Sequence, residues 1–208
     1  MGKNPRENKM SGQINRGSQL GELIFNLVKN KDYKKFLEIG TWNGQGSTKC
    51  FIDALLERDD DYSFTSIEAD IGFYDQAVNF HKNNLSSKIK IIHGTIINDS
   101  DLIEPNSNEE KKWLDNDLKN YKNCQNIWED IQTQFDVVLL DGGEFSTYQE
   151  FLKLKDSTRV FILDDTKMTK TRKVSKHLND DPSWTLNVSS KDRNGFAIFI
   201  KNEFLTDK

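Results

Sequence analysis

Residues 36–48 read Phe36-Leu37-Glu38-Ile39-Gly40-Thr41-Trp42-Asn43-Gly44-Gln45-Gly46-Ser47-Thr48. The stretch begins as a mostly apolar strand with an acid near its end. It continues through three glycines spaced by four and two residues, and a helix opens at Ser47. This order predicts a carboxylate beside backbone N–H groups at the carboxyl end of a strand, where open α/β sheets bind nucleotide ligands. Glycine-rich turns of this kind also occur for purely structural reasons, so both interpretations stay open here.

The glycine spacing, G-x-x-x-G-x-G, differs from two common nucleotide-binding patterns. Dinucleotide-binding turns carry G-x-G-x-x-G, and phosphate-cradling loops carry G-x-x-x-x-G-K-[ST]. No lysine follows the last glycine, Gly46, so a triphosphate would lack its usual cation. The spacing therefore disfavours both a triphosphate site and an NAD-dependent enzyme.

Composition limits the classes of protein further. A chain of 208 residues fits one domain with a substantial core. The formal net charge of −4 disfavours a protein built mainly to bind nucleic acid. The absence of a long apolar run excludes a transmembrane helix, and the polar first 13 residues do not have the pattern of a secretory signal. Cys50 and Cys124 lie far apart, which argues against a zinc site or a disulfide framework and favours a cytoplasmic location.

Strand and helix patterns alternate along the chain. Apolar periodicity predicts helices at 19–29, 47–58, 73–85, 148–154 and 169–178, and strands at 35–39, 63–68, 88–92, 135–140 and 159–163. Two closing strands, 184–188 and 195–201, flank a turn and predict an antiparallel hairpin. The expected fold is α/β: a Rossmann-like, doubly wound, mostly parallel seven-stranded sheet with a C-terminal antiparallel hairpin. Residues 1–18 are expected to form a flexible tail and residues 19–208 a single domain.

The segment between the third and fourth strands, residues 99–134, is unusually long. Its apolar residues from Leu114 to Ile131 recur every three or four positions, which predicts one long amphipathic helix. The ordinary interpretation is a crossover helix that covers the sheet. The alternative is a cap over the substrate.

Acidic residues stand at the ends of four predicted strands, at Glu38, Glu68, Asp141 and the pair Asp164-Asp165. In a parallel sheet these strand ends meet at one edge, so the acids are expected to converge on one cleft. A single acid at a strand end is often a helix N-cap. That explanation does not suffice for all four positions together.

The glycine stretch resembles motif I of the class I S-adenosylmethionine-dependent methyltransferases, roughly [DE]-x-G-x-x-x-G, and the resemblance covers roughly residues 19–201. Glu68 lies 24 residues beyond Gly44, where an acid binds ribose hydroxyls in dinucleotide folds; Asp70 is a weaker alternative. Thr95 and Ile96 follow the third strand, where the family holds adenine. The resemblance implies that S-adenosylmethionine is bound by Glu38, Gly40, Thr41, Gly44, Gly46, Ser47, Glu68, Thr95, Ile96 and Asp141.

Residues 139–144 and 161–165 look most like the small-molecule and sugar O-methyltransferases, such as the macrocin type. This resemblance implies that Asp141, Asp164 and Asp165 hold a Mg²⁺-type ion that chelates the acceptor hydroxyls. Converging carboxylates repel unless they are neutralised, and an all-oxygen ligand set suits Mg²⁺ or Ca²⁺. The alternative is that these acids cap the helices that follow their strands.

The catalytic base is the point at which this sequence departs from the family. Many relatives carry a histidine three residues after the strand-four aspartate, and here that position is Glu144. A carboxylate accepts a proton efficiently only where burial or neighbouring acids raise its pKa. Glu144 and Asp141 are the candidate catalytic residues.

The sequence therefore predicts a methyltransferase that uses S-adenosylmethionine to methylate a hydroxyl of a small molecule or sugar, with metal assistance left open. The alternative, which Glu144 keeps open, is a non-catalytic, regulatory domain that binds a nucleoside. The expected partner is the small-molecule or sugar acceptor. Neither nucleic acid nor a membrane is expected, and homo-oligomerisation is left open.

Overall fold

The computed structural model describes residues 14–105, 107–131 and 134–205. Its seven strands form one sheet in the order β3-β2-β1-β4-β5-β7-β6. The strands are β1 (Lys35–Ile39), β2 (Ser63–Glu68), β3 (Ile89–His93), β4 (Phe135–Leu140), β5 (Thr158–Asp164), β6 (Trp184–Ser190) and β7 (Phe196–Lys201). β1 to β5 are parallel, and β7 runs antiparallel to both β5 and β6. This confirms the predicted α/β sheet and its closing hairpin.

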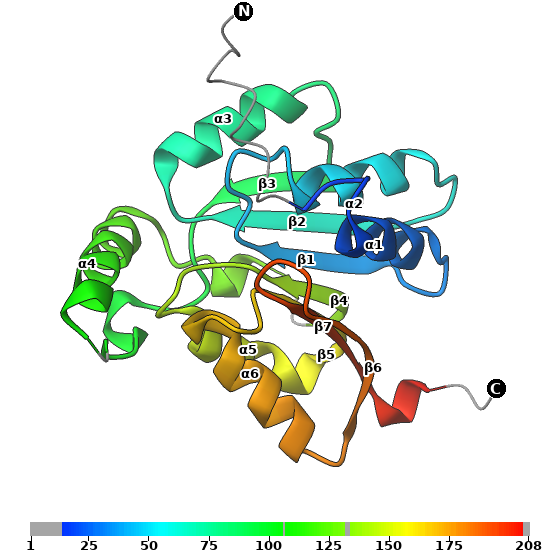
Figure 1. The fold of residues 1–208 in the computed structure, drawn as a ribbon. Coiled ribbons are helices and arrows are strands. Elements are labelled where there is room, and N and C mark those ends of the chain that lie inside the picture. The colour runs from blue at the N-terminus through cyan, green and yellow to red at the C-terminus, as the bar shows by residue number, and fades with distance from the viewer. Residues whose placement is uncertain (1–13, 106, 132–133, 206–208) are drawn as a thin grey trace, which may run out of the picture.

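Helices lie on both sides of the sheet. The α-helices of the described residues are α1 (Gln19–Lys29), α2 (Ser47–Leu56), α3 (Ile71–His81), α4 (Asn108–Asn123), α5 (Thr147–Leu154) and α6 (Thr169–Asp180). Figure 1 shows α1, α2 and α3 on one side and α5 and α6 on the other. No described helix is long and apolar enough to cross a membrane.

The central strands are buried on both faces, so their side chains alternate between two cores. Phe36 of β1 packs with the α1–α2 side, whereas its neighbour Leu37 packs with the α5–α6 side. Val137 and Val138 of β4 divide between the cores in the same way. This alternation follows from the period of two along a strand. Burial on both faces holds the strands firmly and therefore fixes the positions of the residues at their carboxyl ends.

Helix α1 shows how the sequence defines an element locally. Ser18 caps the helix by accepting a hydrogen bond from the N–H of Gly21, and the buried face includes Leu20, Ile24 and Val28. Each such buried side chain contributes about 1.5–3 kcal/mol. Packing begins before the predicted domain boundary, because Ile14 is also buried in this core. Of the predicted tail, residues 1–13 lie outside the described part of the chain.

The prediction of one helix continuing to Ile131 is wrong. α4 ends at Asn123, and Cys124 has an extended backbone. The next residues pair with Thr95, just after β3: the N–H of Thr95 donates to the carbonyl of Gln125, and the N–H of Ile127 donates to the carbonyl of Thr95. This pairing satisfies backbone groups that a continued helix would have used. α4 does not take the crossover position but lies beside the carboxyl ends of the strands (Figure 1).

Candidate functional site

Two cavities open at the carboxyl ends of the parallel strands. The β2–β3 cavity, about 240 Å³, lies between the ends of β1, β2 and β3 and the helix α4. The β4–β5 cavity, about 420 Å³, lies between the glycine turn and the ends of β4 and β5. Gly40, Trp42 and Asp141 line both cavities, so the two spaces adjoin at the end of β1.

The turn after β1 requires glycine at its first position. Gly40 has φ +94°, and a Cβ placed there would lie 2.3 Å from the carbonyl oxygen of Asp141. The ends of β1 and β4 therefore approach each other too closely for any side chain. Trp42 also takes a left-handed backbone, with φ 49°. A tryptophan rarely adopts this conformation, and here it directs the backbone N–H of Trp42 toward the end of β2.

Glu38 lies beneath this turn and lines neither cavity. Its carboxylate is fully buried and accepts hydrogen bonds from the hydroxyls of Ser47 at 2.5 Å, Thr48 at 2.7 Å and Ser66 at 2.6 Å. Burial raises the pKa of Glu38 to about 7, although the three hydroxyls favour its charged form. The structure thus places Glu38 where it joins β1, β2 and the start of α2 and positions the glycine turn.

Glu68, in contrast, lines the β2–β3 cavity. One of its oxygens accepts the N–H of Trp42 at 2.6 Å, and the other accepts the N–H of Asp70 at 2.9 Å. Burial raises the pKa of Glu68 above its usual value. Each carboxylate oxygen can accept a second hydrogen bond, so Glu68 can still bind two neighbouring hydroxyls.

Asp70 also lines this cavity, but one of its oxygens already has a structural role. Oδ1 of Asp70 accepts the N–H groups of Gly72 and Phe73 and so caps α3. This cap explains why α3 begins at Ile71, two residues earlier than predicted. Both oxygens of Glu68 therefore keep one acceptor position each for two neighbouring hydroxyls, whereas Asp70 has only Oδ2 left for a ligand.

The far wall of the β2–β3 cavity contains Thr95 and Ile96 as predicted, but α4 and α5 supply residues that the sequence reasoning missed. The wall includes Asn116, Asp117, Asn120 and Tyr121 of α4 and Glu150 of α5. The hydroxyl of Tyr121 donates to Glu150 at 2.7 Å. Burial raises the pKa of Asp117 to about 6 and that of Glu150 to about 7. No local signal in the sequence marks these polar residues, because only the position of α4 brings them to the cavity.

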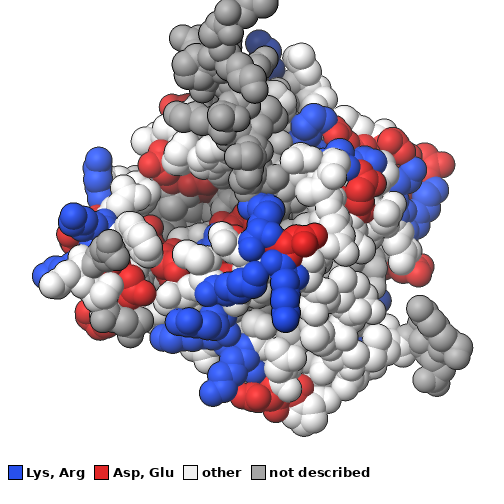
Figure 2. Space-filling model, viewed as in Figure 1, with Lys and Arg blue, Asp and Glu red and all other residues white. Residues whose placement is uncertain are grey.

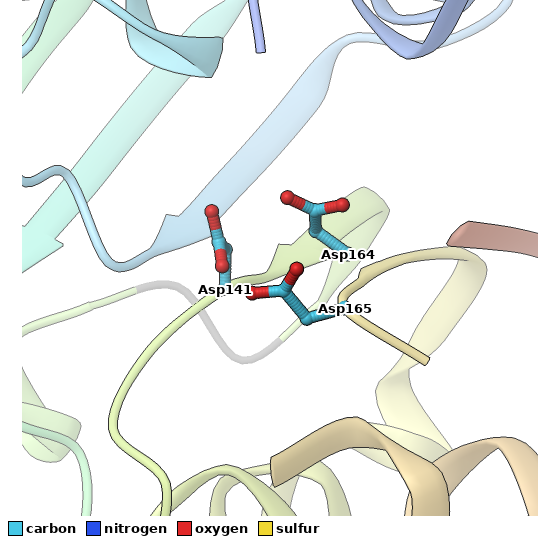
Figure 3. A group of neighbouring side chains, drawn as sticks. All are labelled: Asp141, Asp164 and Asp165. Atoms are coloured by element: carbon cyan, nitrogen blue, oxygen red, sulfur yellow. The ribbon is translucent and has the colours of Figure 1, made fainter. Parts of the chain in front are cut away.

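The β4–β5 cavity is bordered by a cluster of three carboxylates. Asp141 follows β4, Asp164 ends β5 and Asp165 follows it; one oxygen from each lies within 4.8 Å of the others. Figure 3 shows the three carboxylates converging from the two strand ends. Asp165 has φ 56°, so the chain turns sharply after β5. We call this group the aspartate cluster.

Two cations that the sequence reasoning missed neutralise much of this cluster. The ammonium of Lys170 lies 2.5 Å from Oδ1 of Asp141 and 2.9 Å from Oδ2 of Asp165. Arg193 lies 3.5 Å from Asp164. Burial, aided by the charges of Asp141 and Asp165, raises the pKa of Asp164 to about 7. Burial alone would also raise the pKa of Asp165, but Lys170 and its other partners lower it.

The predicted aspartates are not helix caps. Ser146 is the N-cap residue of α5, and Met168 is that of α6. The aspartate cluster is therefore an arrangement in its own right. The four acidic strand ends do not share one cleft as predicted, because Glu38 lines neither cavity and Glu68 lines the β2–β3 cavity.

A divalent metal does not fit the aspartate cluster as it stands. The donor atoms are the hard oxygens that Mg²⁺ prefers. However, Lys170 already contacts two of the three carboxylates, and Arg193 adds a second positive charge near the third. An ion between them would compete with a buried ammonium for the same oxygens.

Glu144 lies outside both cavities. One of its oxygens accepts the backbone N–H of Lys170 at 3.2 Å, at the first turn of α6. Its contact is therefore with the start of a helix. Of the other predicted residues, Thr41, Gly46 and Ser47 line the β4–β5 cavity, whereas Gly44 lines neither cavity and packs against α3.

Basic side chains gather beside the β4–β5 cavity. Figure 2 shows Lys and Arg side chains in a band across this face of the molecule. Lys167 donates to the carbonyl oxygens of Lys191 and Arg193, so these exposed residues lie together, and Arg193 also lines the cavity. Arg193 thus places one positive charge on the lining of a cavity that also carries Asp141, Asp164 and Asp165, and Lys167 lies beside it.

No protein-family model and no curated protein matches the sequence. Solved structures do resemble it. An O-methyltransferase from Bacillus cereus in complex with S-adenosylhomocysteine superposes with a TM-score of 0.63 at 14% identity, over 92% of this chain and 83% of that one. The S-adenosylhomocysteine-bound methyltransferase PaMTH1 from Podospora anserina gives 0.60 at 15%, over 96% and 82%. The O-methyltransferase TomG from Streptomyces achromogenes, in complex with S-adenosylmethionine, gives 0.57 at 16%, over 88% and 79%. The chain therefore has the Rossmann-like fold of class I methyltransferases.

Proposed function

We propose that this protein is a methyltransferase that uses S-adenosylmethionine to methylate a hydroxyl group of a small molecule or sugar. The observation that carries the proposal is the junction of two cavities at Gly40, Trp42 and Asp141, at the carboxyl end of a methyltransferase-like sheet. One cavity presents an acid suited to a ribose, and the other presents the aspartate cluster. Group transfer needs a donor site and an acceptor site that meet in this way.

In this proposal the β2–β3 cavity holds the nucleoside part of the cofactor. Glu68 accepts hydrogen bonds from the two ribose hydroxyls, and the main chain already fixes its carboxylate from both sides. Thr95 and Ile96 border the adenine. The glycine turn, which Glu38 holds from below, would bind the amino-acid part of the cofactor.

The β4–β5 cavity holds the acceptor. When bound, S-adenosylmethionine supplies an electrophilic methyl group, and its sulfur keeps the electron pair of the broken carbon–sulfur bond. Asp164 takes the proton of the acceptor hydroxyl as the oxygen–carbon bond forms. Its position supports this role, because Asp164 lines the cavity and Lys170 bonds the other two aspartates instead. Asp141 and Glu144 stay sequence-based candidates for the base, although Asp141 is paired with Lys170 and Glu144 lies outside both cavities.

The chemistry of the acceptor follows from the surroundings of its cavity. Arg193, which lines the cavity, and Lys167 beside it favour a hydroxylated acceptor that also carries a negative charge. The sequence predicts Mg²⁺ at the aspartate cluster as well. Because the present arrangement of Lys170 does not fit that ion, the proposed reaction routes no step through a metal. A cytoplasmic location stays a prediction from the sequence, and homo-oligomerisation stays open.

A second candidate is a regulatory domain that binds the nucleoside and transfers nothing. The observation that favours it is the neutralisation of Asp141 and Asp165 by Lys170, together with the position of Glu144 outside the cavities. This alternative predicts an intact β2–β3 site and no turnover.

Calorimetry with S-adenosylhomocysteine and with NAD separates the classes of ligand. We expect the first to bind with Kd on the order of micromolar, equivalent to about −8 kcal/mol, and NAD not to bind. Gly40→Arg should abolish binding, whereas the exposed α3 variant Asp75→Asn should not change it. Transfer of a labelled methyl group to a panel of neutral and acidic hydroxylated acceptors then tests catalysis. Binding without transfer would favour the regulatory alternative, and binding of NAD alone would overturn both.

A further inference from the structure

We propose that the ammonium of Lys170 is the resident cation of the aspartate cluster and takes the place that a divalent ion would need. Lys170 then acts as a positioning residue: it holds Asp141 and Asp165 together and leaves Asp164 to face the acceptor. The consequence for methyl transfer rests on the proposed function. The occupancy of the cluster does not, because it concerns only residues of this chain.

The geometry of Lys170 is that of a bridge between two strands. Its ammonium contacts Asp141 after β4 at 2.5 Å and Asp165 after β5 at 2.9 Å. Its side chain is only 12% exposed. Exposed ion pairs contribute little to stability because water competes with them. This pair is shielded, and an ammonium that joins two carboxylates fixes the separation of the two strand ends.

The position of Lys170 in α6 also supports its role as the cation of the aspartate cluster. It is the second residue of α6, where the positive end of the helix dipole disfavours a cation. The two carboxylates offset this unfavourable position. Asp165 contributes by its left-handed backbone, a conformation uncommon outside glycine. The turn at Asp165 and the start of α6 thus bring one anion and one cation back to the end of β4.

The same contacts explain why the wild-type cluster should reject a divalent ion. Mg²⁺ requires oxygens at about 2.0–2.1 Å in nearly octahedral geometry. Lys170 engages one oxygen of Asp141 and one of Asp165, and the guanidinium of Arg193 approaches Asp164. Removal of the Lys170 charge would leave three converging carboxylates beside one cation. That arrangement should bind a hard cation.

The test is a gain of metal binding. Lys170→Met keeps a long side chain and removes the charge, and Lys173→Met is the matched control on the exposed side of the same helix. Electron paramagnetic resonance titration with Mn²⁺, without cofactor or acceptor, measures binding directly, and Mg²⁺ serves as the competitor. We expect no stoichiometric site in the wild type or in Lys173→Met. In Lys170→Met we expect one site, with affinity at least about tenfold higher, that Mg²⁺ displaces.

Several outcomes overturn the proposal. Stoichiometric Mn²⁺ binding by the wild type does so, and so does a folded Lys170→Met that gains no affinity. If circular dichroism shows that Lys170→Met is unfolded, addition of Mn²⁺ should restore the fold, and failure to restore it counts against the proposal. Lys170→Arg keeps a positive charge and should bind no Mn²⁺; stoichiometric binding by this variant also overturns the proposal.

Catalysis supplies a second readout. Wild-type transfer should be unaffected by EDTA, whereas transfer by Lys170→Met should fall at least about tenfold without metal and recover with Mg²⁺. EDTA-sensitive transfer by the wild type contradicts the proposal. If no variant transfers a methyl group but the Mn²⁺ results hold, only the proposed function fails.

Discussion

At the end of β2 the acids accept hydrogen bonds from the backbone, whereas at the ends of β4 and β5 they pair with side-chain cations. Glu68 binds the N–H groups of Trp42 and Asp70, both within the neighbouring turns. Asp141 and Asp165 instead bind Lys170, which comes from α6. The two cavities adjoin, but different parts of the chain hold their acids in place.

This difference determines how each cavity should respond to amino-acid substitutions. A carboxylate held by backbone N–H groups stays in place as long as the turns keep their shape. A carboxylate held by a side-chain cation depends on one side chain from another element, here Lys170 of α6. Substitutions in α6 should therefore leave the residues of the β2–β3 cavity in place but disturb those of the β4–β5 cavity.

The largest effect, on the free energy of unfolding, is expected where the two cavities adjoin. Gly40→Ala would place a Cβ 2.3 Å from the carbonyl oxygen of Asp141 and force a left-handed backbone on alanine. Strain and overpacking together should lower the free energy of unfolding by at least about 3 kcal/mol. Urea denaturation measures the loss. Gly72→Ala in the first turn of α3, where φ is not positive, is the control and should change stability by less than about 1 kcal/mol. An equal effect of both substitutions would contradict the close approach of β1 and β4.

Asp164→Asn should impair the role of the β4–β5 cavity in catalysis without affecting cofactor binding in the β2–β3 cavity. Loss of a proton acceptor in the β4–β5 cavity is expected to lower kcat by a factor of about 10² to 10⁴. The Kd for S-adenosylhomocysteine should change little, because Glu68 and its backbone partners are untouched. Single-turnover kinetics and calorimetry measure the two quantities. Equal loss of both would mean that Asp164 supports the whole site and does not serve the acceptor alone.

Glu68→Ala should have the opposite pattern. Removal of a charged acceptor of two ribose hydrogen bonds is expected to weaken binding of S-adenosylhomocysteine by about 1.5–3 kcal/mol. Adding Glu68→Ala to the Lys170→Met variant should not change the affinity of that variant for Mn²⁺. Calorimetry checks the first statement, with Asp75→Ala on the exposed side of α3 as the control. Unchanged binding would remove Glu68 from the ribose site.

The smallest effect concerns Glu38, whose carboxylate accepts hydrogen bonds from three hydroxyls beneath the glycine turn. Its pKa is about 7 in the fold against 4.5 for an unperturbed glutamate, so the folded state binds more protons between these values. The free energy of unfolding should therefore fall as pH rises through this window, by about 1–2 kcal/mol from pH 5 to 7 for this group. Urea denaturation of wild type and Glu38→Gln at both pH values isolates the contribution. In Glu38→Gln the free energy of unfolding should depend less on pH than in the wild type. An identical pH dependence in the two proteins would refute the raised pKa of Glu38.

Several parts of the site followed from the sequence because their signals are local. The acid at the end of β2 and the glycine after β1 occupy the predicted places, and Thr95 and Ile96 line the same cavity as Glu68. The convergence of Asp141, Asp164 and Asp165 followed from the parallel order of the strands. Glu144 could not be placed in the same way, because its position depends on how the loop after β4 meets α6.

The sequence by itself determined the alternation of strands and helices and the edge at which the acids gather, since apolar periodicity and strand-end residues are properties of short segments. Only the tertiary structure decided that α4 ends at Asn123 and borders a cavity, because pairing of the following residues with Thr95 overrides the helical spacing. It also decided which cation meets the aspartates. Lys170 and Asp141 are 29 residues apart, and their contact exists because β4 and β5 are neighbours in the sheet and the turn at Asp165 directs α6 back toward them.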